Sequence, residues 1–140
     1  MSSVFGRFCL LLLLAASFAV PVGARAQTSP PAATKTIPRY LVYFDEFSAY
    51  LSPESKKKIA LVAKQAKAEG IKSITVQARA SATGTVQTNK YLAMTRASIV
   101  ADELAADGIA PSMIQQEPIG QTGSSDPSVF NRRVDIILPP

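Results

Sequence analysis

The stretch from Tyr40 to Glu54, YLVYFDEFSAYLSPE, contains the end of one predicted element and the start of the next. Its first five residues, 40–44, are aromatic or branched and form a short run, which is typical of a buried strand. Ser52 can cap a helix, Pro53 suits the first helical position, and the acid Glu54 interacts favourably with the helix dipole. The stretch therefore predicts a strand followed by a helix.

The residues after this stretch extend the helix and then return to a strand. Apolar residues recur at helical spacing on one face, at Ile59, Val62, Ala63 and Ala66. Gly70 suits the position just after the helix end. From Ile74 to Ala78 apolar and polar residues alternate, which predicts a half-buried strand.

The second half of the chain adds a second helix and one or two further strands. A loop at 81–85 precedes a predicted helix over 87–106, and a short strand is predicted over 114–119, interrupted by Pro118. A loop is expected over 120–128 and a closing strand over 134–138. The order predicts an α/β fold, more fully an α+β sandwich, βαβαβ(β), with two main helices packed on a small mixed sheet.

The first 26 residues have the pattern of a secretory signal peptide. Arg7 precedes an apolar run at 8–20, and Ala24-Arg25-Ala26 follows as an A-x-A cleavage site. The run is shorter than the ~20 residues of a membrane anchor, and Cys9 lies before the apolar core rather than after it, unlike a lipoprotein cysteine. We expect a signal peptide at 1–26, a flexible linker at 27–38 and one domain at 39–140, with no membrane span.

Composition excludes several kinds of function. The 140 residues include no His and one Cys, so Ser-His-Asp and Cys-His catalysis and most zinc sites are excluded. Although the net charge is +5, the basic run Lys56–Lys58 falls in the first turns of a helix, where a solvated face explains it. We expect no enzyme activity, no cofactor, no metal and no nucleic acid partner.

Arg96 does not fit the core pattern of the second predicted helix. On a helical wheel it falls inside the apolar stripe formed by Leu92, Ile99, Val100 and Leu104. Burying its permanent charge without a partner would be very costly. It therefore either reaches an edge or meets an anion, which is an internal carboxylate such as Glu103 or Asp135, or the carboxylate of a ligand.

Arg132 and Arg133 form a second cationic pair before the closing strand. Alternation sends the two side chains to opposite faces. One then faces solvent and the other can line the region of Arg96, although a charged strand end explains the pair equally well.

Four segments resemble, in order, the motifs of the OmpA C-terminal-like domain family. Residues 42–54 are similar to its opening signature, and 76–84 to its second strand and binding loop. Residues 89–97 share the Asn, Leu, Arg and Ala of its second helix, and 131–136 the closing Asn-Arg-Arg-Val-acid. The resemblance covers residues 40–138, which is nearly the whole predicted domain.

The resemblance implies a periplasmic module that binds peptidoglycan non-covalently, through the diaminopimelate of the stem peptide. In this family a loop Asp and a helix Arg suit the ammonium and the carboxylate of that ligand, and Arg96 matches the helix Arg. The site residues that the resemblance implies are Ser81, Thr83, Gly84, Asn89, Arg96, Arg132 and Arg133.

This sequence also departs from the family pattern. Ser81 stands where the family has the loop Asp, and Arg79 stands where it has His. Thr95 and Ser128 replace two family arginines, and Asp126 is a candidate for the missing negative charge. Binding then persists weakly, shifts to a modified stem peptide, or is lost.

The sequence leaves two other functions to consider. A protein-interaction or scaffold module on the same fold, with a partner in the cell envelope, would explain the loss of the acid at Ser81. An enzyme using Ser81 as nucleophile and Lys90 as base has no support in their spacing. Whether the module binds peptidoglycan or a protein partner, we expect a soluble periplasmic protein in contact with the cell wall or outer membrane.

Overall fold

The computed structural model describes residues 37–122 and 128–139, which lie in one compact unit, Lys35–Pro140. The predicted signal peptide and nearly all of the predicted linker lie outside these ranges. The elements are β1 (Arg39–Tyr43), α1 (Pro53–Ala68), β2 (Ile74–Ala80), α2 (Val86–Ala106), the 3₁₀ turn η1 (Pro111–Met113), β3 (Ile114–Gln121), α3 (Ser128–Asn131) and β4 (Arg133–Ile137).

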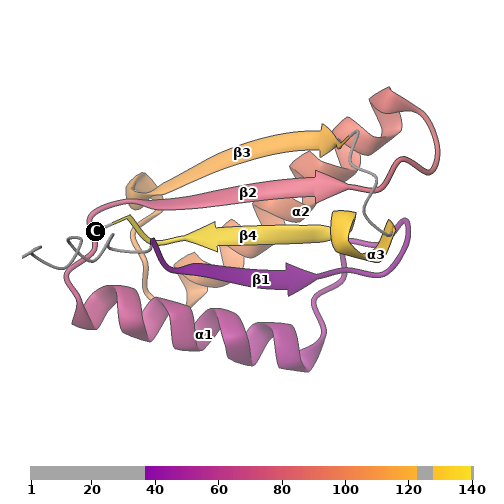
Figure 1. The fold of residues 1–140 in the computed structure, drawn as a ribbon. Coiled ribbons are helices and arrows are strands. Elements are labelled where there is room, and N and C mark those ends of the chain that lie inside the picture. Colours follow the sequence, from indigo (N-terminus) through magenta and orange to yellow (C-terminus); the bar gives the residue numbers. More distant parts are fainter. Residues whose placement is uncertain (1–36, 123–127, 140) are drawn as a thin grey trace, which may run out of the picture. The chain divides into compact units, whose positions relative to one another are not determined.

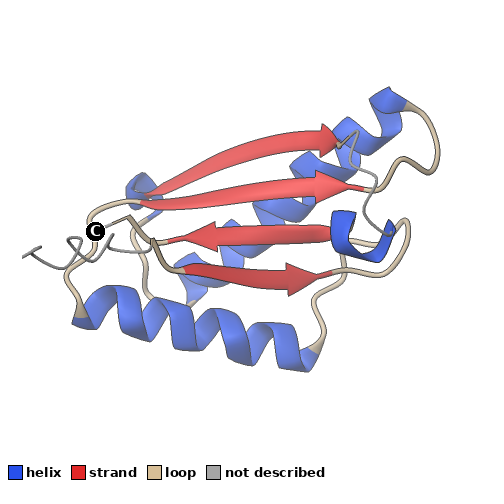
Figure 2. Ribbon diagram, in the orientation of Figure 1, coloured by secondary structure: helices blue, strands red, loops and turns tan. Residues whose placement is uncertain are grey.

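The four strands form one mixed sheet in the order β1-β4-β2-β3. β4 runs antiparallel to both of its neighbours, whereas β2 and β3 are parallel. The long helices α1 and α2 pack against the sheet (Figure 1). Three helices and a mixed sheet confirm the predicted α+β class (Figure 2).

The limits of α1 follow from its terminal residues. Ser52 is the N-cap, and its hydroxyl accepts a hydrogen bond from the Ser55 amide at 3.2 Å. Pro53 occupies the first turn, where its missing N–H costs nothing. After the C-cap Glu69, Gly70 has a φ of +65°, a conformation that glycine adopts without strain. The predicted start and end of this helix are therefore confirmed.

The core lies between the two long helices and one face of the sheet. The predicted apolar face of α1 is fully buried, and α2 contributes Ala93, Ala97, Val100 and Leu104. Facing them, alternate strand residues are Val42, Val76, Ala78, Val134 and Ile136. Because strand side chains alternate between faces, the residues between these positions lie on the other side of the sheet.

The third strand and the loop after it differ from the prediction. β3 continues through Pro118 to Gln121, with a register shift opposite Ala78 and Arg79. Proline has no N–H to donate to a neighbouring strand, and it is tolerated here because β3 lies at the edge of the sheet. The loop predicted over 120–128 is therefore wrong at both ends, since α3 begins at Ser128.

No helix within residues 37–122 or 128–139 is both long enough and apolar enough to cross a bilayer.

Candidate functional site

Arg96 lies in the middle of α2 and is completely buried, with 0% of its surface exposed. Its guanidinium donates to three backbone carbonyls. Nε binds Ser48 O at 2.8 Å, Nη2 binds Asp45 O at 2.9 Å, and Nη1 binds Arg79 O at 3.2 Å. Two of these carbonyls belong to the β1–α1 loop and the third to the end of β2. The side chain therefore joins three segments at one end of the sheet.

Neither of the internal acids proposed for Arg96 is its partner. Glu103 pairs instead with Lys56 at 3.3 Å, and Asp135 pairs with other arginines on the opposite face of the sheet. Nor does Arg96 reach an edge of the core. Backbone carbonyls solvate it in place of a carboxylate, and among the described residues no acid forms an ion pair with it.

The positive charge of Arg96 is thus buried but not neutralised. Burial, together with the nearby charge of Arg132, lowers the pKa of Arg96 to about 10. The group therefore stays protonated at neutral pH. Its Cζ lies 5.1 Å from the ring centroid of Phe44, within the range of a cation–π contact. This end of the sheet therefore holds a permanent cation that attracts anions.

The predicted binding loop follows β2 directly, next to Arg96. Ser81 is nearly buried, two residues beyond the carbonyl that Arg96 binds, whereas Thr83 and Gly84 are exposed. Phe47 lies against this loop, since a Cβ built at Gly84 would be 3.8 Å from Phe47 Cε1. The β1–α1 loop and the β2–α2 loop are therefore neighbours beside the guanidinium.

Asn89 supports this arrangement from the first turns of α2. It is 1% exposed, and its side-chain amide donates to Gln121 Oε1 at 3.3 Å. Thr122 in turn donates to Asn131 Oδ1 at 2.8 Å, which links the end of β3 to α3. Asn89 is thus buried among protein groups rather than facing an open site.

Arg132 lies at the same end of the sheet and lines a pocket. Its Nε donates to Phe44 O at 3.4 Å. The pocket has a volume of about 270 Å³ and includes one acid, Asp45, besides this base. Its full lining is Tyr43, Phe44, Asp45, Tyr50, Ser52, Val129 and Arg132. Phe44 and Asp45 touch both this pocket and Arg96.

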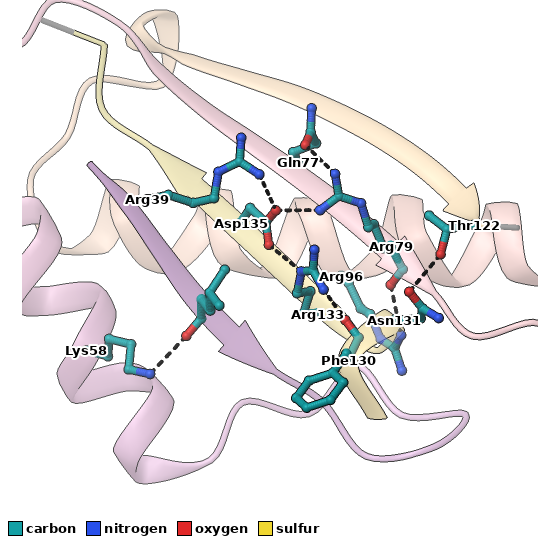
Figure 3. A network of polar contacts seen from close by, with 11 residues as sticks. Arg39, Lys58, Gln77, Arg79, Arg96, Thr122, Phe130, Asn131, Arg133 and Asp135 are labelled. Atoms are coloured by element: carbon teal, nitrogen blue, oxygen red, sulfur yellow. Dashed lines mark hydrogen bonds and ion pairs between the residues drawn. The ribbon is translucent and has the colours of Figure 1, made fainter. Parts of the chain in front are cut away.

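Arg133 does not join this group. Its Nε donates to Asp135 Oδ1 at 2.8 Å, on the sheet face away from Arg96 (Figure 3). Opposite faces for Arg132 and Arg133 were predicted from strand alternation. Arg79 also binds Asp135 there, so its charge does not point toward the loop of Ser81.

A larger hollow of about 550 Å³ lies between α2 and β3, but it contains none of the predicted site residues. Its lining is Met94, Thr95, Ser98, Ile99, Gln116 and Pro118. The Thr95 hydroxyl bonds back to Tyr91 O at 3.0 Å. The candidate site is therefore the end of the sheet around Arg96 and Arg132.

Sequence reasoning missed two parts of this site. Asp45 and Ser48 hold Arg96 through their backbone carbonyls, which no side-chain pattern reveals. The positive φ of Phe47, 53°, was equally hidden, because non-glycine residues rarely adopt it. Asp126 lies outside the described residues, so its proposed role as the missing acid stays a prediction.

The sequence of this chain is similar to that of proteins of one known family. A sequence profile of the OmpA family matches residues 43–132. The chain is 31% identical over 124 residues to Outer membrane protein A of Bordetella avium, covering 84% of this chain. It spans 64% of the length of that relative.

Solved structures share the fold. The OmpA-like domain of FopA1 from Francisella tularensis is 28% identical, with a TM-score of 0.66, covering 71% of this chain and 70% of that one. The peptidoglycan-associated lipoprotein of Burkholderia pseudomallei has a TM-score of 0.64 at 23% identity, covering 71% and 89%. The periplasmic domain of Helicobacter pylori MotB gives 0.59 at 22%, covering 69% and 68%.

Proposed function

Since this chain belongs to the OmpA family, we propose that it is a periplasmic module that binds peptidoglycan non-covalently, through the diaminopimelate of the stem peptide. A relative named for the outer membrane and a structural neighbour named peptidoglycan-associated support an envelope role. In this proposal the protein binds its ligand and catalyses no reaction.

The observation that carries this proposal is the buried charge of Arg96, which no carboxylate of the described residues balances. An unbalanced cation beside a loop raises the local affinity for a ligand carboxylate. Its three carbonyl contacts use three of the five guanidinium N–H groups. The remaining two are buried with the rest of the side chain, so Arg96 acts on a ligand through its positive potential. Together with the charge of Arg132 nearby, this potential favours an anionic group at this end of the sheet.

The ligand's ammonium needs a negative partner, which the loop no longer supplies at Ser81. Asp45 lines the neighbouring pocket together with Arg132, so this pocket offers both an acid and a base. We propose that Asp45 takes over part of the role of the family's loop Asp. The zwitterionic end of diaminopimelate would then lie between Asp45 and Arg132.

The replacement of acid by hydroxyl at Ser81 weakens binding but does not abolish it. A hydrogen bond to a charged group contributes about 1.5–3 kcal/mol and a neutral one about 1 kcal/mol. The difference corresponds to roughly a tenfold change in affinity. Restoring the acid should recover this factor.

The test is co-sedimentation with purified diaminopimelate-type peptidoglycan. We expect the wild-type protein to pellet with the wall material and Ser81→Asp to bind about tenfold more tightly. Ser73→Asp is the matched control, because it adds the same charge just before β2, at the end of the strand opposite Ser81. If neither the wild type nor Ser81→Asp pellets above the level without peptidoglycan, the proposal is wrong.

The loss of the acid at Ser81 also favours a second candidate, a protein-interaction module that has abandoned peptidoglycan. This candidate predicts that Ser81→Asp leaves sedimentation unchanged. It also predicts that a partner crosslinks to the protein equally well in the presence and absence of wall material.

A further inference from the structure

One face of the sheet carries a cluster of arginines around a single acid. Arg39 on β1, Arg79 on β2 and Arg133 on β4 surround Asp135, which lies in the middle of β4 (Figure 3). We call these four residues the arginine cluster. The residues paired across the strands with Asp135 are Leu41 and Gln77, so the cluster spans three adjacent strands.

The acid at the centre is fully enclosed. Asp135 is 0% exposed although it lies on the sheet face opposite the apolar core, because the three arginine side chains cover it. Arg39 Nη1 reaches Oδ2 at 3.2 Å and Arg133 Nε reaches Oδ1 at 2.8 Å, and Arg79 also binds Oδ2. One carboxylate therefore balances one of three charges, and two remain.

Within the described residues, the hydrogen bonds of the cluster lead to one further acid, Glu117. The second guanidinium nitrogen of Arg79 donates to Gln77 Oε1 at 2.8 Å, and the Gln77 amide donates to Glu117 Oε2 at 3.0 Å. Glu117 thus meets the cluster through Gln77 rather than through an ion pair with an arginine. The face keeps a positive excess centred between β1 and β4.

The arginines keep unused donors toward solvent. Arg39 is half exposed, at 50% of its side chain, and spends one N–H on Asp135, so most of its five donors are available. The side chains of Arg79 and Arg133 are only 17% and 21% exposed, and both bind Asp135. Held in this way, the guanidinium groups have already lost much of the side-chain freedom that binding would cost.

We propose that the arginine cluster is a docking surface for an acidic segment of a partner protein. Charge complementarity selects an anionic partner. The recessed position of Arg79 and Arg133 favours a shaped protein surface over a flat lipid surface. Tyr43, 41% exposed and paired across the strands with Arg133, adds an aromatic group, and Tyr and Arg are the residues enriched in interface hot spots.

The chain's own N-terminal segment does not suit this surface. Residues 1–38 contain three basic residues and no Asp or Glu, so they repel the cluster rather than complement it. The charged centre of the docking surface lies on the opposite face of the sheet from Arg96, and neither Arg96 nor Arg132 is one of the three arginines around Asp135. The two regions meet at Tyr43, which also lines the pocket of Arg132, and at the backbone of Arg79, whose carbonyl accepts from Arg96.

The test uses a fluorescein-labelled peptide of six Glu and two Leu residues, followed by fluorescence anisotropy at low salt. We expect saturable binding that weakens as salt is raised. Arg39→Gln should weaken it about fivefold, since Arg39 is the most exposed of the three arginines and its bond to Asp135, at 3.2 Å, is longer than that of Arg133, at 2.8 Å. Lys57→Gln removes the same charge from the exposed surface of α1 and should change binding less than about twofold.

Several results would overturn the proposal. One is the absence of peptide binding, and another is an equal loss for Arg39→Gln and Lys57→Gln. Binding to vesicles of phosphatidylcholine with phosphatidylglycerol that depends on Arg39, without peptide binding, would identify a membrane surface instead. A dimer in sedimentation that Arg39→Gln dissociates would identify a second copy of the chain.

Discussion

The contacts of Arg96 predict that replacing it with Met strongly destabilises the fold. The change removes three hydrogen bonds of 2.8, 2.9 and 3.2 Å from a charged donor. At about 1.5–3 kcal/mol each, the three bonds together contribute more than the net loss of stability that we expect from the substitution. Removing the charge relieves its own burial cost, and the Asp45 and Ser48 carbonyls, in a loop, can regain water. We therefore expect a loss of about 3–5 kcal/mol.

Urea unfolding followed by circular dichroism measures this loss directly. For a domain of this size each kcal/mol lowers Tm by roughly 4–8 °C, so the loss is also visible on heating. Lys64→Met is the matched control, because Lys64 is exposed on α1, and it should stay within about 0.5 kcal/mol of the wild type. If the free energy of unfolding of Arg96→Met is less than about 1 kcal/mol below that of the wild type, the structural role of these bonds is refuted.

Three further changes test other parts of the fold by the same unfolding measurement. Asp135→Asn removes the buried negative charge that three partly exposed arginines share and should cost about 3 kcal/mol, whereas Glu103→Gln breaks a surface pair and should cost under about 1 kcal/mol; equal costs would contradict the enclosure of the acid. Ser52→Ala removes the N-cap of α1 and should cost about 1 kcal/mol, and no loss would mean that the cap contributes nothing. Gly120→Ala and Gly70→Ala both place a Cβ at a positive φ, +79° and +65°, without a steric clash, so each should cost about 1–2 kcal/mol; a loss below about 0.5 kcal/mol at both positions would contradict the left-handed backbone there.

The sequence predicted the parts of the fold that local chemistry determines. The cap at Ser52, the apolar face of α1 and the glycine at position 70 each identify an element limit without reference to the rest of the chain. The continuation of β3 through Pro118 was not predictable in this way, because it depends on the strand lying at the edge. The four-residue α3 is too short to show any periodicity.

The candidate site was predictable only in part. The helical wheel placed Arg96 among core residues, and it is completely buried. Its partners are backbone carbonyls, which every residue has, so no sequence pattern distinguishes them. Asp135 was considered as a partner for Arg96 but binds three other arginines, because the pairing of β4 with both β1 and β2 fixes which side chains meet.

The buried guanidinium also affects how binding is tested. Because Arg96 holds the β1–α1 loop, its removal would impair the fold together with any ligand contact. Substitutions at Ser81 or Asp45 leave these backbone bonds in place, so they separate binding from folding.

The most direct measurement is a titration of the ¹⁵N-labelled protein with diaminopimelate, followed by the chemical shifts of its backbone amides. The account predicts saturable shifts concentrated at residues 45–50, 81–85 and 129–132, and a higher affinity for Ser81→Asp. Shifts that are absent in both proteins, or confined to the strands bearing Arg39 and Asp135, would contradict the proposal that this end of the sheet binds the cell wall.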